Sequence, residues 1–89
     1  MQTTKFVKQP VAVSVIVEKD GRVFPRKFLW KDGQTYKIDR ITRVERAAST
    51  KVGGCGIRYT VMVEGLPRYL YDEGGKWFME DAVVIEVDT

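Results

Sequence analysis

The chain has 89 residues, with 15 Lys or Arg against 12 Asp or Glu, no His and a single Cys. This length fits one small domain. Without an imidazole, Ser-His-Asp and Cys-His catalytic arrangements and every His-containing zinc site are excluded, and one Cys excludes an internal disulfide and Cys-rich metal sites. We therefore expect a non-enzymatic protein that uses no metal and no cofactor.

The charge is unevenly distributed along the chain. Residues 1–39 and 40–58 each carry four more basic than acidic residues, whereas residues 72–89 hold six acidic residues against Lys76 alone. A basic body with an acidic C-terminal segment is therefore expected. The longest apolar stretch, residues 11–17, is too short for a signal peptide or a membrane span, so no membrane contact is expected. The unpaired thiol favours a reducing, cytoplasmic location.

The first elements predicted along the chain form a hairpin. The polar residues 1–10 are expected to be a flexible N-terminus. Residues 11–17 have Val at every second position, and Asp20-Gly21 follows where a tight turn is needed, which predicts a strand paired with residues 23–30. Pro25 indicates an edge or a bulge near the start of that second strand. Asp32-Gly33 predicts another tight turn before a strand over residues 35–38.

Residues 39–50 are ambiguous between a helix and a strand. The spacing of Ile38, Ile41 and Val44 also fits one face of a helix, with Asp39 at the N-cap position. The β-branched side chains favour a strand, in which a bulge takes up the spacing from Ile38 to Ile41. We therefore predict a strand here.

The remaining strand signals lie at residues 57–64, 68–71, 76–79 and 83–87. The segments 65–67 and 72–75 between them are rich in turn-forming residues. Five or six short antiparallel strands at this spacing predict an all-β fold: a single small barrel over residues 11–89, SH3-like, with an OB-like arrangement as the alternative if residues 39–50 form a helix.

The connection between residues 46 and 58 is the candidate binding site. It has three glycines within four positions, and successive backbone N–H groups at such glycines can form a nest that binds anions. No acidic residue occurs from residue 46 to residue 63. The alternative is a flexible connection whose glycines only adopt unusual φ angles. The candidate residues for an anion or nucleic acid are Arg40, Arg43, Arg46, Lys51, Gly53, Gly54, Gly56 and Arg58.

Cationic and aromatic residues alternate at Arg58-Tyr59, at residues 68–71 and at residues 76–78. This composition is typical of surfaces that stack bases and bind phosphates. Because alternate residues of a strand face opposite ways, half of these aromatics must enter the core, and a core with an amphipathic rim is the alternative. Cys55 is not expected to be catalytic, since neither a His nor a nearby carboxylate can act as its base.

Two functions are compatible with these residues. The first is a small binding module whose basic Gly-rich loop holds an anionic partner such as nucleic acid. The alternative is a protein-interaction or self-assembling module, such as a homodimer, that pairs through an exposed strand edge, with residues 83–87 as the candidate contact.

Three motifs stand out together: FxWxxGxxYxID at residues 28–39, RAASxKxGGxGxRYTV at residues 46–61 and GKWF at residues 75–78. They resemble a family of short uncharacterised bacterial proteins over residues 24–80, and the middle motif is the most specific. The resemblance implies a cytoplasmic, all-β bacterial protein. It implies no activity, cofactor or partner.

Overall fold

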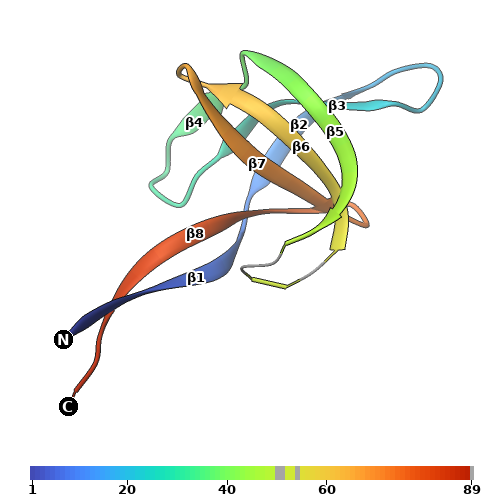
Figure 1. Ribbon diagram of the computed structural model, residues 1–89. Coiled ribbons are helices and arrows are strands. Elements are labelled where there is room, and N and C mark those ends of the chain that lie inside the picture. Colours follow the sequence, from blue (N-terminus) through green and yellow to red (C-terminus); the bar gives the residue numbers. More distant parts are fainter. Residues whose placement is uncertain (50–51, 54, 89) are drawn as a thin grey trace.

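The structure is a computed structural model that describes residues 1–49, 52–53 and 55–88. Its described strands form two antiparallel sheets (Figure 1), a five-stranded sheet in the order β1-β8-β7-β6-β5 and a three-stranded sheet in the order β2-β3-β4. The strands are β1 (Gln2–Pro10), β2 (Ala12–Val17), β3 (Val23–Leu29), β4 (Thr35–Lys37), β5 (Arg40–Ala48), β6 (Cys55–Val63), β7 (Leu66–Glu73) and β8 (Lys76–Glu86). The all-β class is confirmed. The two sheets do not close on one another, so the SH3-like barrel is not confirmed.

The small sheet follows the turn signals of the sequence. Gly21 and Gly33 have φ angles of 90° and 83°, which a residue with a side chain rarely adopts. Pro25 is buried in β3 and pairs with Val15 of β2. The register of β2 with β3 shifts between Ser14 and Val15, directly beside this pair. Both predicted Asp-Gly turns are therefore confirmed, and of the edge or bulge predicted near Pro25 the structure has a bulge directly after it.

The ambiguous stretch after residue 39 is a strand, as predicted. β5 pairs with β6 from Arg40 to Ala48, and its register shifts between Ile41 and Arg43. This bulge lies one step later than the sequence indicated. It keeps Ile41 packed against the core although the apolar spacing departs from strict alternation.

The N-terminal residues differ most from expectation. Where the sequence predicts a flexible terminus, β1 pairs with β8 along its whole length, from Gln2 opposite Glu86 to Pro10 opposite Phe78. β8 is one continuous strand where two short strands were predicted. The paired strands form a ribbon, here called the β1/β8 ribbon, that projects from the body with both chain termini at its tip (Figure 1). The molecule is accordingly elongated, with extents of 56 × 25 × 20 Å.

The core lies between the two sheets. Val61 and Leu70 are fully buried, and burial of one such side chain contributes about 2 kcal/mol. The remaining core members come from β3, β6 and β8 and from the residue after β4; the core cluster is Phe28, Ile38, Tyr59, Val61, Val63, Leu70 and Met79. Within the part of the chain that the structure describes, no helix is long and apolar enough to cross a membrane.

Candidate functional site

The candidate anion-binding arginines lie on two faces of the large sheet. Arg40 and Arg43 stand opposite Met62 and Thr60, on the same face of β6 as Arg58. Arg46 stands opposite Ile57, the neighbour of Arg58 in β6. Because neighbouring residues of a strand point to opposite faces, Arg46 lies on the other face of the sheet. Lys51 and Gly54 lie outside the described residues. The structure thus brings Arg40, Arg43 and Arg58 to one face and separates Arg46 from them.

Arg58 is already engaged by the protein. Its guanidinium forms an ion pair with Glu45, whose other oxygen lies 3.0 Å from Arg43, and it stacks 4.5 Å from the centre of the Tyr69 ring. The hydrogen bond from Arg58 lowers the pKa of Glu45, and the same bond raises the pKa of Arg58. An external anion at Arg58 would therefore compete with Glu45.

The two described glycines of the loop have structural explanations. Gly53 has a φ angle of 74°, and its N–H donates to the carbonyl oxygen of Ser49 at 3.1 Å. A Cβ atom on Gly56 would lie 2.2 Å from the carbonyl oxygen of Asp72 in β7. Gly53 therefore closes a turn, and Gly56 permits the close approach of β6 and β7. Neither role depends on an anion.

A second site, which the sequence did not indicate, lies where β7 and β8 separate. These strands pair only at three positions next to their turn, the last being Tyr71 opposite Phe78. β8 then leaves β7 and continues as the partner of β1 (Figure 1). Within the described chain, no ladder pair joins residues 66–70 of β7 to β8. The edges of the two strands consequently face each other across an opening.

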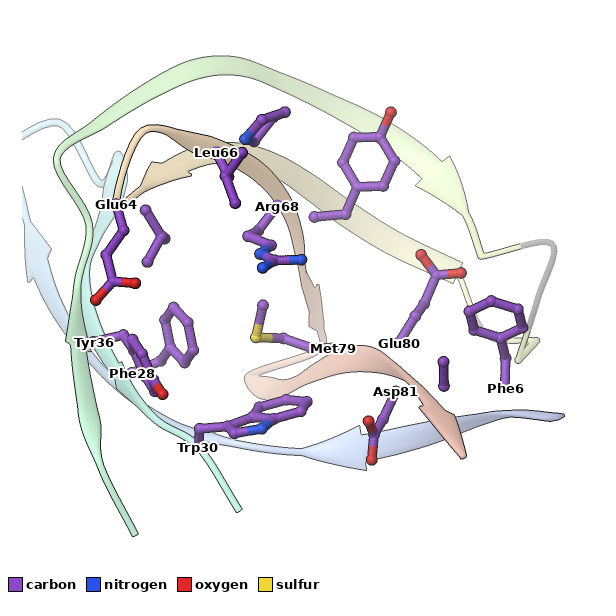
Figure 2. A pocket seen from close by; sticks show the side chains of 14 residues that line it. Phe6, Phe28, Trp30, Tyr36, Glu64, Leu66, Arg68, Met79, Glu80 and Asp81 are labelled. Atoms are coloured by element: carbon purple, nitrogen blue, oxygen red, sulfur yellow. The ribbon is translucent and has the colours of Figure 1, made fainter. Parts of the chain in front are cut away.

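The opening leads into a cavity of about 590 Å³ that we call the β7/β8 groove (Figure 2). Its floor is mainly aromatic and apolar, with Phe28 of β3, Trp30 directly after β3, Tyr36 of β4 and Met79 of β8. Figure 2 shows the Arg68 side chain extending from β7 over Met79, between the walls. The full lining is Phe6, Phe28, Trp30, Tyr36, Val63, Glu64, Leu66, Pro67, Arg68, Tyr69, Met79, Glu80, Asp81 and Ala82.

The charged groups of the groove are not equally available. Asp81 is buried and forms an ion pair with Lys31 of the β3–β4 turn. Glu80 accepts hydrogen bonds from the hydroxyls of Tyr71 at 3.3 Å and Ser49 at 3.2 Å. Arg68, in contrast, is exposed and forms no ion pair with any described residue. Glu64, the remaining charged residue of the lining, is also exposed, so the groove presents the guanidinium of Arg68 and the carboxylate of Glu64 above an apolar floor.

The sequence carried a weak signal for this site. Residues 68–71 belong to a cation-aromatic pattern, and Glu80-Asp81 lies between the strands predicted over residues 76–79 and 83–87. The structure places both carboxylates in the middle of one strand, at the point where it departs from β7. An acidic pair within an otherwise apolar strand was the available hint.

No family model, curated protein or solved structure matches this chain. The similarity of its motifs to short bacterial proteins therefore stays an expectation. Among the described residues, no group of three or more Cys, Asp or Glu side chains could hold a metal ion. The geometry of the groove is therefore the feature that bears on function.

Proposed function

We propose that this protein is a non-enzymatic interaction module that receives an extended polypeptide segment in the β7/β8 groove. The observation that carries the proposal is the separation of β7 from β8 after three ladder pairs, above an apolar cavity. Unpaired strand edges are the usual templates for strand addition by another chain.

Backbone chemistry favours a strand as the occupant. Residues 66–70 of β7 and 79–82 of β8 direct backbone groups into the opening, and such groups need hydrogen-bond partners when water is removed. An extended segment offers N–H and C=O groups on both of its edges. Its side chains alternate in direction, so every second one would enter the cavity above Trp30 and Met79.

Arg68 adds a chemical preference to this shape. Its guanidinium can bind a carboxylate through two parallel hydrogen bonds, and such charge-assisted bonds are the strongest in proteins. The segment that fits is therefore an extended one that places an acidic side chain beside Arg68. We further propose that residues 11–89 form the SH3-like small barrel expected from the sequence, left open on the side of the groove.

The basic loop receives less support as a binding site. Its arginines are divided between two faces, and Arg58 is paired with Glu45. The binding of nucleic acid there stays a prediction, and its test is given in the Discussion.

The proposal is tested by titrating the labelled protein with two synthetic peptides of sequence TVEVEVT and TVKVKVT, capped at both ends, and recording NMR spectra. We expect the acidic peptide to shift the amides of residues 66–70 and 79–82 and the indole N–H of Trp30. The lysine peptide should bind far more weakly, because it places a cation beside Arg68.

A charge-reversal variant supplies the control. Arg68→Glu should reverse the preference between the two peptides, while Arg43→Glu, on the sheet face outside the groove, should leave it unchanged. Loss of the charged hydrogen bond corresponds to roughly a ten-fold or larger decrease in affinity for the acidic peptide. Spectra that do not change at millimolar peptide, or changes confined to β1, would refute the proposal.

A further inference from the structure

We infer that the outer surface formed by strands β3 to β7 binds single-stranded nucleic acid, at a site separate from the β7/β8 groove. The site is a series of cations, here called the basic band, that ends at an exposed aromatic ring. Its members are Arg26, Lys27, Lys37, Arg40, Arg43, Arg58 and Tyr69. Four features of the described residues carry the inference.

The first feature is a pair of lysines that the fold places directly opposite each other. Lys27 of β3 is the partner of Lys37 of β4, next to the pair of Phe28 and Tyr36, which packs into the core. Because neighbouring residues of a strand point to opposite faces, both lysines point away from the core. Neither forms an ion pair with any described residue. Like charges directly opposite destabilise a strand pair, so this arrangement is unfavourable unless an anion neutralises it.

The second feature is the continuity of the cations from the small sheet to the large one. Arg26 is the residue that the bulge in β3 leaves without a partner in β2, and Arg40 begins β5. Both line one hollow of about 360 Å³, together with the buried side chain of Ile38. The hollow therefore connects the lysine pair with the arginines on the outer face of the large sheet.

The third feature is the balance of charge. Among the described residues of this surface, the acidic ones are Glu18 and Asp39, which line the same hollow, and Glu45, which pairs with Arg43 and Arg58. Six of the 15 basic residues of the chain and three of its 12 acidic residues therefore lie here, which leaves nine of each kind elsewhere. The net charge of +3 thus belongs to the basic band, and such a surface attracts a polyanion.

The fourth feature is the exposed ring at the end of the band. Tyr69 of β7 stands opposite Thr60, which in turn stands opposite Arg43, so these side chains share one face. The Tyr69 residue is 47% exposed, and the guanidinium of Arg58 lies 4.5 Å from the centre of its ring. An exposed ring backed by a guanidinium is a surface on which an unpaired base can stack. Stacking there leaves the ion pair of Arg58 with Glu45 intact.

These features favour a flexible single strand over other polyanions. The core lies between the two sheets, so their outer faces point in different directions. The band turns between them at Ile38 and Asp39, whose N–H groups donate to Arg26 of β3 and Met62 of β6. A flat anionic membrane can contact the band on one side of this turn only, whereas a single strand can follow it. A duplex keeps its bases stacked on one another and offers none to Tyr69.

The band and the groove are distinct sites. Arg68 and Tyr69 are neighbours in β7 and point to opposite faces, with Arg68 extending over the floor of the groove (Figure 2). Tyr69 also contributes to the lining of the groove, because β7 forms one of its edges. The remaining members of the band are not part of that lining. Binding of nucleic acid and binding of a peptide can therefore be tested, and can fail, separately.

Titration of the labelled protein with a single-stranded oligothymidine of about 12 nucleotides tests the site. At low salt we expect NMR shifts at the amides of Lys27, Lys37, Arg40 and Tyr69, while Gly53 of the basic loop stays unchanged. Shifts at Gly53 without shifts at Lys27 and Lys37 would assign the nucleic acid to the loop and overturn the inference. Unchanged spectra at millimolar oligothymidine would overturn it as well.

Lys37→Gln tests the lysine pair through two opposite effects. The slope of log affinity against log salt should decrease in magnitude by about 0.7, because one phosphate contact is lost. The urea midpoint should rise, because the repulsion from Lys27 is removed. Lys37→Arg should keep both wild-type values. Lys5→Gln makes the same change of charge on β1, outside the band, and should leave the salt slope unchanged. An equal decrease in Lys5→Gln would show attraction by net charge alone and would overturn the site.

Variants of Tyr69 test the stacking. Tyr69→Ala should weaken the binding of oligothymidine about five-fold or more, whereas Tyr69→Phe should retain it. Urea unfolding of both variants shows whether they are folded. A duplex of the same length and vesicles of anionic phospholipid should bind more weakly than oligothymidine. Equal affinity for the duplex, tighter binding of the vesicles, or full affinity in folded Tyr69→Ala would overturn the assignment to a single strand.

Discussion

Replacing Gly56 with Ala tests whether the glycine of the basic loop serves packing or an anion. A Cβ atom on Gly56 would lie 2.2 Å from the carbonyl oxygen of Asp72, 3.0 Å from its carbonyl carbon and 3.1 Å from Cα of Glu73. All three atoms belong to the backbone of β7, so no side chain can rotate away. β6 and β7 would have to separate by roughly 1 Å to restore ordinary contact distances.

We expect a loss of about 3 kcal/mol in the free energy of unfolding, the upper end of the range for overpacking, because the obstacle is backbone. A domain of this size has a total of only about 4–13 kcal/mol. The matched control is Gly65→Ala, where nothing lies within 4 Å and only the φ angle of 79° opposes a side chain. That strain costs about 1 kcal/mol.

Urea unfolding followed by tryptophan fluorescence measures both variants, and thermal melts give an independent reading. About 3 kcal/mol corresponds to a decrease in Tm of roughly 12–24 °C, against about 4–8 °C for the control. A Gly56→Ala variant as stable as Gly65→Ala would show that strand spacing does not require this glycine. The anion-nest interpretation of the loop would then regain support.

Three further predictions follow from the described contacts. The hydrogen bond from Arg58 holds the pKa of Glu45 in the folded protein below its usual 4.5. The stabilisation that this bond provides is therefore complete above pH 4.5 and is lost as the pH falls through the pKa of the folded state. Glu45→Gln should flatten the acid limb of a curve of stability against pH, measured by urea unfolding. Leu70→Ala, at a fully buried position, should cost about 2–5 kcal/mol in urea unfolding, whereas Val84→Ala on the exposed ribbon should change stability by less than about 0.5 kcal/mol in the isolated molecule. If the basic loop binds nucleic acid, oligonucleotides at low salt should shift the NMR signals of Gly53 and Arg58, with an affinity that falls steeply as salt is added; unchanged spectra at tens of micromolar would end that hypothesis.

The local elements of the fold were predictable because their signals are local. The alternating valines of β2 and the two Asp-Gly pairs specify strand and turn through residues that are neighbours in the chain. The strand at β5 required weighing β-branched residues against a helical spacing, and the bulge reconciles the two patterns. In these cases the tertiary structure agrees with the local preference.

The ribbon and the groove were not predictable on the same basis. β1 has few apolar residues and no clean alternation, and it pairs with a strand whose residues lie 68 to 84 positions later in the sequence. Glu80 and Asp81 suggested a break between two strands, yet their carboxylates are held by Tyr71, Ser49 and Lys31, which are distant in sequence. The groove exists only through the path that β8 takes between two partners.

That path has identifiable physical causes. Two-stranded ribbons twist more strongly than wide sheets, so nine residues of pairing with β1 turn β8 away from the direction of β7. The stacked rings of Tyr71 and Phe78, 4.8 Å apart, mark the last position where β7 and β8 are paired. Beyond it, the ion pair of Asp81 with Lys31 ties β8 to the turn of the small sheet.

Closing the groove within one molecule would therefore require untwisting the ribbon and breaking the Lys31–Asp81 contact at a buried carboxylate. A strand from another molecule requires neither, because it can follow the twist of β8 while it pairs along the free edge. The opening is thus maintained by contacts on both of its sides, and adding a strand from outside satisfies its backbone groups with less rearrangement than closing it from within. This asymmetry is the physical reason for assigning the groove to a partner segment rather than to an alternative fold of the same chain.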